Sequence, residues 1–286
     1  MTTITQKIEQ LGYAEFLGVF DQDTPEWHES RAGISGSDIG AITGKSPWTS
    51  PYTLWARKSG YLPEVPKNMM MRLGQAFETP IIDIYREEHP LQTIHFTGTW
   101  ASAFEPTWKA NPDAIIEFAF GDLGILEIKF SRSYWDRVPE QYVMQVQWYM
   151  HILGLKRAII ASVAAGEYSE WEFEYDEDLM RNTELDVRRF QRTLRDGTAP
   201  EWDGSQSTYE TVRTLSPGLV DGETELGNLW VNLSNAKANY DDADRVFNAY
   251  KSATLAAMDG TKIGTYDGKP VIALQARNGK PFITFK

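Results

Sequence analysis

The sequence predicts an α/β (α+β) fold, in which helices flank a mixed central β-sheet. Three observations support this prediction. Helical and strand patterns follow one another in the order helix, three strands, helix, strand. The run 158–164 is apolar except for Ser162, which is typical of a strand covered on both faces. The 286 residues are 42% hydrophobic and 13% aromatic, so the chain has the material for a sizeable core.

The first third of the chain is predicted to be largely helical. A leader helix is expected over residues 8–20, followed by a polar turn over 21–25. The glycine- and serine-rich stretch 33–40 is expected to open a short helix, because its serines suit an N-cap. A Ser-Pro pair starts a helix over 50–58. Apolar residues spaced by three or four predict a longer helix over 68–88.

The middle of the chain combines strands with two helices. Strands are expected over residues 93–99, 114–120, 124–130, 158–164 and 170–175. The second and third are joined by the pair Gly121-Asp122, which is typical of a hairpin turn. Helices are expected over 139–153, where Gly154 ends the pattern, and over 176–195.

The composition changes near residue 203 and predicts the domain organisation. Residues 203–222 are rich in Gly, Ser, Thr and Pro, and we interpret them as a linker. A long polar helix is expected over 223–258 and a β-meander over 262–286, with turns at Asp-Gly and Asn-Gly pairs. The prediction is therefore a main domain of residues 1–202 and a C-terminal helix plus β-meander appendage of residues 223–286.

The composition also excludes several kinds of chemistry. The absence of cysteine excludes disulfides, thiol catalysis and Cys-ligated metals. The four histidines lack metal-ligand spacing, so any metal is expected to have oxygen ligands, as Mg²⁺, Mn²⁺ and Ca²⁺ do.

No apolar run is long enough for a membrane span. The first residues lack the pattern of a signal peptide, so we expect an intracellular protein. The net charge of −12 argues against general adhesion to nucleic acid, although a local basic groove remains compatible with it.

The most informative residues are Asp113, Glu127 and Lys129. Residues two apart on a strand share a face, so Glu127 and Lys129 project together. The predicted hairpin brings Asp113, 14 residues before Glu127, alongside them. Two carboxylates on neighbouring strands form an oxygen site suited to Mg²⁺, and such a site can activate water against a phosphodiester. The lysine can orient that water or stabilise the developing negative charge.

A simpler interpretation is a solvated hairpin face that carries an ordinary Glu/Lys pair. We favour the catalytic interpretation because both charges lie inside the otherwise apolar run LGILEIKF. Charges in such a run are costly unless they are paired or bound to a metal.

Three further motifs accompany these residues in a fixed order. The stretch WHESRAGISGSDIG occupies residues 27–40, GQAFE occupies 74–78, and QVQWY occupies 145–149. Together with the Asp and Glu-x-Lys pair, they make the chain resemble the PD-(D/E)XK nuclease superfamily and, within it, the lambda-exonuclease-like, YqaJ-type viral recombinases. The resemblance covers residues 27 to about 175 and implies a restriction-endonuclease-like core.

The resemblance implies a role for each residue of the metal site. Asp113 and Glu127 would be the principal ligands, with the Ile128 carbonyl as a backbone ligand. Glu78 would complete the metal shell directly or through water. Lys129 would activate or orient the attacking water. Two Mg²⁺ ions per active site are implied, or Mn²⁺ in their place.

The resemblance also implies contacts to DNA. Gln145 would brace the site or the scissile phosphate. Arg31 and Ser37 would bind a 5′-terminal phosphate. Serine hydroxyl donors and a guanidinium group are chemically suited to binding an anion. Ser35 and Asn111 are further candidate phosphate contacts, although the serines could serve only as helix caps.

The implied activity is a 5′→3′ double-strand DNA exonuclease of phage or prophage recombination, which leaves 3′ single strands. An endonuclease or junction resolvase on the same fold is one alternative, and a non-catalytic DNA-binding protein is another. The implied partners are double-stranded DNA ends and a phage single-strand annealing protein. A homo-oligomeric ring, often a trimer, and the cytoplasm of a bacterial host are implied as well.

Overall fold

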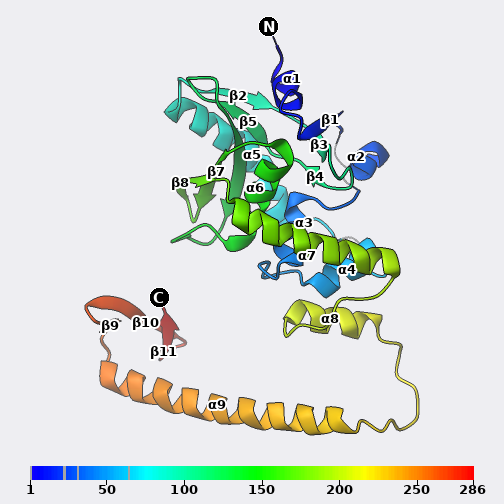
Figure 1. Cartoon of the computed structure of the whole chain (residues 1–286). Helices are drawn as coiled ribbons and strands as arrows, with labels where there is room; N and C mark the ends of the chain where they lie inside the picture. Colours follow the sequence, from blue (N-terminus) through cyan, green and yellow to red (C-terminus); the bar gives the residue numbers. More distant parts are fainter. Residues whose placement is uncertain (1, 22–23, 31, 64) are drawn as a thin grey trace. The chain divides into compact units, whose positions relative to one another are not determined.

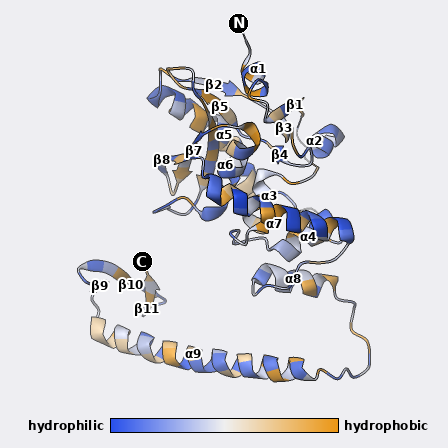
Figure 2. Ribbon diagram, in the orientation of Figure 1, coloured by the Kyte–Doolittle hydropathy of each residue, from blue (hydrophilic) through white to orange (hydrophobic). Residues whose placement is uncertain are grey.

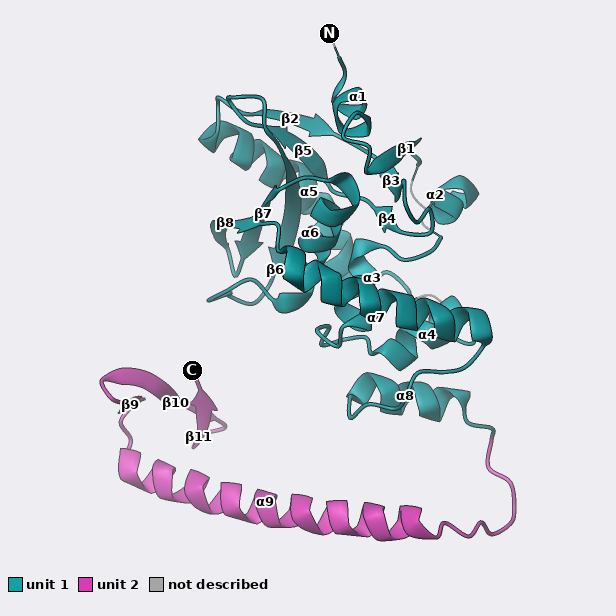
Figure 3. Cartoon of the chain, in the orientation of Figure 1, with its two compact units in different colours: residues 1–217 teal, residues 218–286 magenta. Residues whose placement is uncertain are grey.

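The computed structural model describes residues 2–21, 24–30, 32–63 and 65–286 of the chain (Figure 1). It divides into two compact units, residues 1–217 and residues 218–286 (Figure 3).

The first unit is built on a five-stranded sheet with the strand order β2-β5-β6-β7-β8. Its strands are β2 (Thr93–Phe96), β5 (Ala114–Glu117), β6 (Leu123–Ser131), β7 (Arg157–Ala164) and β8 (Glu167–Glu174). β6 and β7 are parallel, and the other neighbouring strands are antiparallel. Helix α6 (Glu140–Leu153) makes the crossover that parallel neighbours require. A mixed sheet flanked by helices confirms the predicted fold class.

Helices cover both faces of this sheet (Figure 1). On one face, Ile81 and other apolar residues of α5 (Met69–Glu88) pack in a cluster with Leu126 of β6. On the other face, Trp148 of α6 packs in a cluster with Ile125. Alternate residues of a strand point to opposite faces, so Glu127 belongs to the face that α6 covers.

A second, three-stranded sheet has the order β1-β3-β4. Its strands are β1 (Ala14–Gly18), β3 (Thr99–Ser102) and β4 (Lys109–Ala110). The predicted leader helix over 8–20 is wrong. The chain instead forms a short helix α1 (Ile4–Glu9), turns at Gly12 with a φ of +78°, and continues as β1. Pairing with β3 outweighs the weak helical pattern of this segment.

The single strand predicted over 93–99 is also wrong, because it is divided between the two sheets. β2 ends at Phe96 and β3 begins at Thr99. At Gly98 between them, a Cβ atom would lie 2.2 Å from the carbonyl oxygen of Gly18. Glycine therefore permits the close approach of β1 to this corner. The strand predicted over 114–120 is shorter than expected and ends at Glu117.

Helices α3 (Gly36–Ile42), α4 (Pro51–Lys58) and α7 (Glu177–Asp196) lie close to their predicted boundaries. Helix α2 (Pro25–Ser30) was not predicted and begins at the end of the predicted polar turn. Side-chain caps explain several of the starts. The side chains of Ser50, Asn68 and Asp176 each accept a hydrogen bond from a backbone N–H three residues later.

The linker predicted over 203–222 is wrong over its first part, which forms helix α8 (Gln206–Leu215). This helix packs on α4 through hydroxyl groups. The Thr53 hydroxyl lies 2.7 Å from that of Ser207 and 2.8 Å from that of Thr211. A composition typical of loops therefore serves here as a polar contact between two helices.

The second unit contains a long helix and a small sheet. Helix α9 (Asn228–Met258) precedes the antiparallel strands β9 (Ile263–Tyr266), β10 (Lys269–Arg277) and β11 (Lys280–Phe285). Both β-turns contain an Asn or Asp followed by Gly at positive φ, as the sequence predicts. Apolar and polar residues are interspersed along α9 (Figure 2). Among the helices described, none combines the length and the apolar character needed to cross a bilayer.

Candidate active site

The hairpin of β5 and β6 places Asp113 beside Glu127. Ala114 pairs with Leu126 across the hairpin, so Asp113, one residue earlier, comes next to Glu127. The Asp113 carboxylate accepts a hydrogen bond of 2.7 Å from the backbone N–H of Ile128. This bond fixes the first carboxylate of the predicted site against β6.

Glu127 is a buried carboxylate, with 2% of its surface exposed. Its Oε1 accepts hydrogen bonds from the Lys129 ammonium and from the side-chain amide of Gln145, the latter at 2.7 Å. Its Oε2 is buried and has no hydrogen-bond partner among the described residues. A buried carboxylate oxygen that lacks a donor is costly, which makes it a natural position for a cation.

Gln145 joins this site to α3 through Tyr149. The Gln145 amide donates a second hydrogen bond, of 2.9 Å, to the Tyr149 hydroxyl. The ring of Tyr149 is buried against Gly36, where a Cβ atom would lie 2.3 Å from ring carbon Cε1. The packing of α3 on α6 thus sets the position of the amide that holds Glu127.

Glu78 and Asp113 line a common groove of about 490 Å³. Glu78 comes from α5, and the groove is also lined by Gln75, Asn111 and Lys67. The Asn111 carbonyl accepts a hydrogen bond of 2.7 Å from the Thr99 hydroxyl, while its amide nitrogen is buried without a partner among the described residues. The groove therefore presents carboxylates and an unsatisfied amide donor together.

The three carboxylates interact electrostatically. Burial, then the negative charge of Asp113, raise the pKa of Glu78 to about 7, while Lys129 acts in the opposite direction. Burial and the charge of Asp113 also raise the pKa of Glu127, again opposed by Lys129. Mutual repulsion of this kind is relieved when a positive charge binds between the groups.

The donor set fits a divalent cation with oxygen ligands. Asp113, Glu127 and Glu78 supply carboxylate oxygens, which Mg²⁺ and Mn²⁺ prefer. In the part of the chain that the structure describes, no three Asp, Glu, His or Cys side chains are gathered closely enough to hold an ion together. For Ile128, the defined contact to Asp113 is made by its N–H, and the predicted role of its carbonyl remains a prediction.

The predicted phosphate-binding residues differ in their surroundings. Arg31 lies outside the described residues. Ser35 is buried, and both its N–H and its hydroxyl donate to the Asp38 carboxylate, at 2.8 and 3.2 Å. Ser37 is exposed, and its hydroxyl lies 3.0 Å from that of Ser35. Ser35 thus serves the start of α3, and Ser37 remains available to a ligand.

The structure adds two residues that the sequence motifs did not indicate, Arg57 and Tyr142. Ser37 and Gln145 line a pocket of about 310 Å³ together with Arg57, Trp48 and Tyr142. The Tyr142 ring lies 6.4 Å from Trp48, and the Lys129 ammonium lies 5.0 Å from the Tyr142 centroid. The sequence signal for them is weak, because an Arg near the end of a helix and isolated aromatic residues are common in any core.

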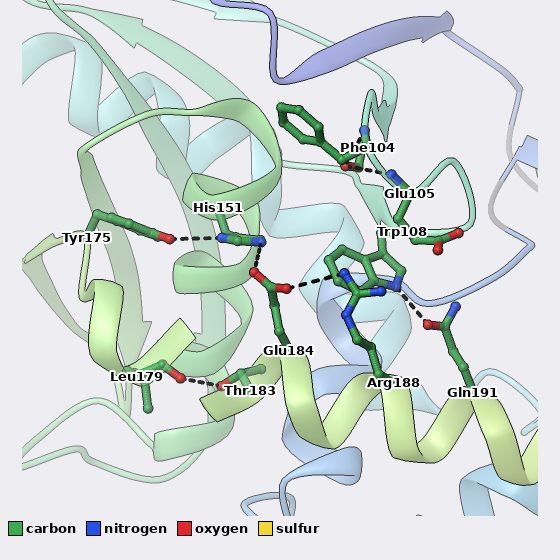
Figure 4. Close-up of polar contacts among 11 residues, drawn as sticks. Phe104, Glu105, Trp108, His151, Tyr175, Leu179, Thr183, Glu184, Arg188 and Gln191 are labelled. Carbon is green, nitrogen blue, oxygen red and sulfur yellow. Dashed lines mark hydrogen bonds and ion pairs between the residues drawn. The ribbon is translucent and has the colours of Figure 1, made fainter. Parts of the chain in front are cut away.

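A separate polar cluster lies between α6 and α7 (Figure 4). His151 Nδ1 is 2.8 Å from the Tyr175 hydroxyl, and its Nε2 is 3.3 Å from Glu184. Arg188 pairs with Glu184 at 3.4 Å and places its guanidinium 4.7 Å from the Trp108 centroid. Burial lowers the pKa of His151. These contacts explain the cluster as packing between two helices.

Comparison with known proteins supports the predicted resemblance to YqaJ-type viral recombinases. Residues 26–156 match the YqaJ-like viral recombinase domain, which confirms the predicted resemblance for this stretch. The chain is also 30% identical over 203 residues to the protein YqaJ of Bacillus subtilis (strain 168). That match covers 66% of this chain and 62% of YqaJ, so the chain spans less than two thirds of this relative.

Two solved structures share the fold of the first unit. Both are of LHK-Exo, an alkaline exonuclease from Laribacter hongkongensis, one of them in complex with dAMP. Each is 20% identical and matches 61% of this chain and 94% of LHK-Exo, with TM-scores of 0.52 for the dAMP complex and 0.50 for the other. At this identity the likeness establishes the fold.

Proposed function

We propose that this chain is a divalent-metal-dependent DNA exonuclease that digests one strand in the 5′→3′ direction from double-stranded ends. The observation that carries this proposal is the buried Glu127, held by Lys129 and Gln145 beside Asp113. A buried carboxylate with one unsatisfied oxygen needs a cation, and the match to the viral recombinase domain supports a DNA substrate.

Each residue has a role in the proposed reaction. Asp113, Glu127 and Glu78 would hold Mg²⁺ or Mn²⁺, two ions in the proposal. When bound, these ions supply Lewis acidity toward water and the phosphate. Lys129 orients the attacking water or stabilises negative charge on the phosphate. Gln145 keeps the Glu127 carboxylate in place through its amide.

The preference for a 5′ end would come from the pocket beside Gln145. Ser37 and Arg57 line this pocket. The resemblance implies that Arg31 would also bind the phosphate. An arginine that faces a phosphate supplies a charge-assisted hydrogen bond. A phosphate held there sets the scissile bond at a fixed distance from the end of the strand.

The proposal extends to biological partners. The product would be a 3′ single strand, bound by a phage single-strand annealing protein in the cytoplasm of a bacterial host. A ring-shaped homo-oligomer, often a trimer in the family that the chain resembles, would enclose the duplex. Positive charge confined to the inside of such a ring would reconcile DNA binding with a net charge of −12.

The test uses three substrates: a linear duplex with 5′-phosphates, the same duplex without them, and a closed circle. We expect nucleotide release in Mg²⁺ from the phosphorylated duplex, little from its unphosphorylated twin, and none from the circle or in EDTA. Cutting of the circle would indicate the endonuclease alternative. Absence of metal-dependent release from every substrate would contradict the proposal.

A further inference from the structure

Helix α9 carries a regular apolar seam that continues over four heptads. The seam residues alternate in steps of four and three. They are Leu229, Leu233, Ala236, Tyr240, Ala243, Phe247, Tyr250, Thr254 and Ala257. Such a repeat is the signature of a helix that pairs with another helix in a left-handed coiled coil.

Most of this seam is not covered by the rest of the second unit. Leu233, Tyr240 and Tyr250 expose 62%, 68% and 70% of their surfaces. The β-meander packs on the C-terminal half of the helix, where the ring of Phe285 lies 6.2 Å from that of the seam residue Phe247 and Met258 is buried. An exposed apolar row of this length marks a surface that binds a partner.

We propose that this seam binds α9 of a second copy of the chain in the antiparallel direction. The sizes of the seam residues support this choice. In heptad notation the large residues Leu233, Tyr240 and Phe247 occupy a positions, and Ala236 and Ala243 occupy d positions. In an antiparallel pair each a residue faces a d residue. When Tyr240 faces Ala243, Phe247 faces Ala236 and Leu229 faces Thr254, so these layers each combine a large residue with a small one, whereas Leu233 faces Tyr250. A parallel pair would place Tyr on Tyr and Ala on Ala.

Charge fixes the register of the pair. The e positions beside the seam hold Trp230, Lys237, Asp244 and Lys251. When Tyr240 faces Ala243 of the second copy, Lys237 lies beside Asp244 of the second copy. Trp230 then lies beside Lys251 of the second copy, a cation–π arrangement.

Neighbouring registers lack this complementarity. A shift by one heptad in one direction brings Asp244 against Asp244 and Lys237 against Lys251. A shift in the other direction brings Lys237 against Lys237. Like charges at these positions disfavour both shifts. In the single chain, Lys237 instead pairs with Asp241 on its own helix, an exposed contact that association can replace.

The first test measures the mass of the full chain in solution by light scattering. We expect Tyr240→Glu to halve the mass of the wild-type assembly, and Asn235→Glu, on the opposite side of the same helix, to leave it unchanged. Lys237→Asp and Asp244→Lys should each weaken association at least tenfold, and the double exchange should restore it. A mass that Tyr240→Glu does not change would overturn the proposal, whether the chain is a monomer or a ring formed by the first unit.

The second test determines the direction of the pair and benefits from a chain without cysteines. Ala236→Cys/Phe247→Cys, whose positions face each other across the proposed pair, should form a covalent dimer on oxidation. The two positions are eleven residues, or about 16 Å, apart on one helix and cannot join within a chain. Ala236→Cys alone should not cross-link, because its neighbour in the antiparallel pair is Phe247 of the second copy. A cross-link through Ala236→Cys, or its absence in the double variant, would show that the antiparallel assignment is wrong.

Discussion

At the scale of single residues, the site depends on the burial of Glu127 beside one ammonium group. Removal of one partner of a buried ion pair leaves an uncompensated charge and costs about 3–5 kcal/mol. We therefore expect Lys129→Met to lower the free energy of unfolding of the metal-free chain by about 3 kcal/mol at pH 9. Urea unfolding measures this change. The matched control is Lys45→Met, which removes an exposed pair with Glu140 and should cost under about 1 kcal/mol. Equal losses in the two variants would contradict the account.

The raised pKa of Glu78 gives a pH dependence with a definite sign. The pKa is about 7 in the folded chain against an ordinary value of 4.5, so between these values the folded state binds the proton that the unfolded state has released. The stability of the metal-free chain should fall as the pH rises through this range. Glu78→Gln should flatten that fall, measured by urea unfolding in EDTA from pH 4.5 to 8. An identical pH profile in the variant would show that Glu78 is not held in a neutral form.

The sequence alone predicted the carboxylates of the candidate site but missed part of the geometry and some of the residues around them. The approach of Asp113 to Glu127 was predictable because the two lie on neighbouring strands of one hairpin. The predicted two-residue turn was wrong, because Glu117 pairs with Leu123 and the connection has five residues, so the exact register was not predictable. The contact of Gln145 with Glu127 was not predictable in geometry, since it depends on how α6 crosses the sheet. Arg57 was missed because the pocket that it lines joins α4 to α6, and no local pattern records such a contact.

At the scale of elements, the packing of α3 on α6 positions the amide that holds Glu127. Gly36 permits this packing, because a Cβ atom there would overlap the Tyr149 ring. We expect Gly36→Ala to cost about 1–3 kcal/mol through overpacking, measured by thermal unfolding. Gly74→Ala on α5 is the control: nothing lies within 4 Å of its added Cβ, so it should stabilise the chain by about 0.5–1 kcal/mol. Stabilisation by both substitutions would refute the role of Gly36.

Capped and periodic elements were the predictable ones. The helices over 50–58, 68–88 and 139–153 were found because caps and apolar spacing agree there. The segment 8–20 was misjudged because its role in the second sheet depends on pairing with β3, far along the chain. Helix α8 was missed because serine and threonine favour loops, whereas here their hydroxyls bond to α4.

At the scale of the whole molecule, the proposed nuclease activity and the proposed pairing of α9 rest on different units. The match to the viral recombinase domain lies within the first unit, and the helical seam lies entirely in the second. The net charge of −12 makes the chain as a whole repel DNA, so binding must depend on local cations and on metal at the carboxylate site. Divalent ions are thus required by the proposal both for chemistry and for contact with the substrate.

The most direct measurement is the binding of Mn²⁺ to the full chain, followed by electron paramagnetic resonance without DNA. The account predicts that wild-type protein binds Mn²⁺ and that Asp113→Asn and Glu127→Gln each weaken this binding at least tenfold. Glu117→Gln, which alters a carboxylate paired with Lys7 at the other end of β5, should leave it unchanged. Equal Mn²⁺ affinity in all four proteins would contradict the claim that Asp113 and Glu127 form a metal site.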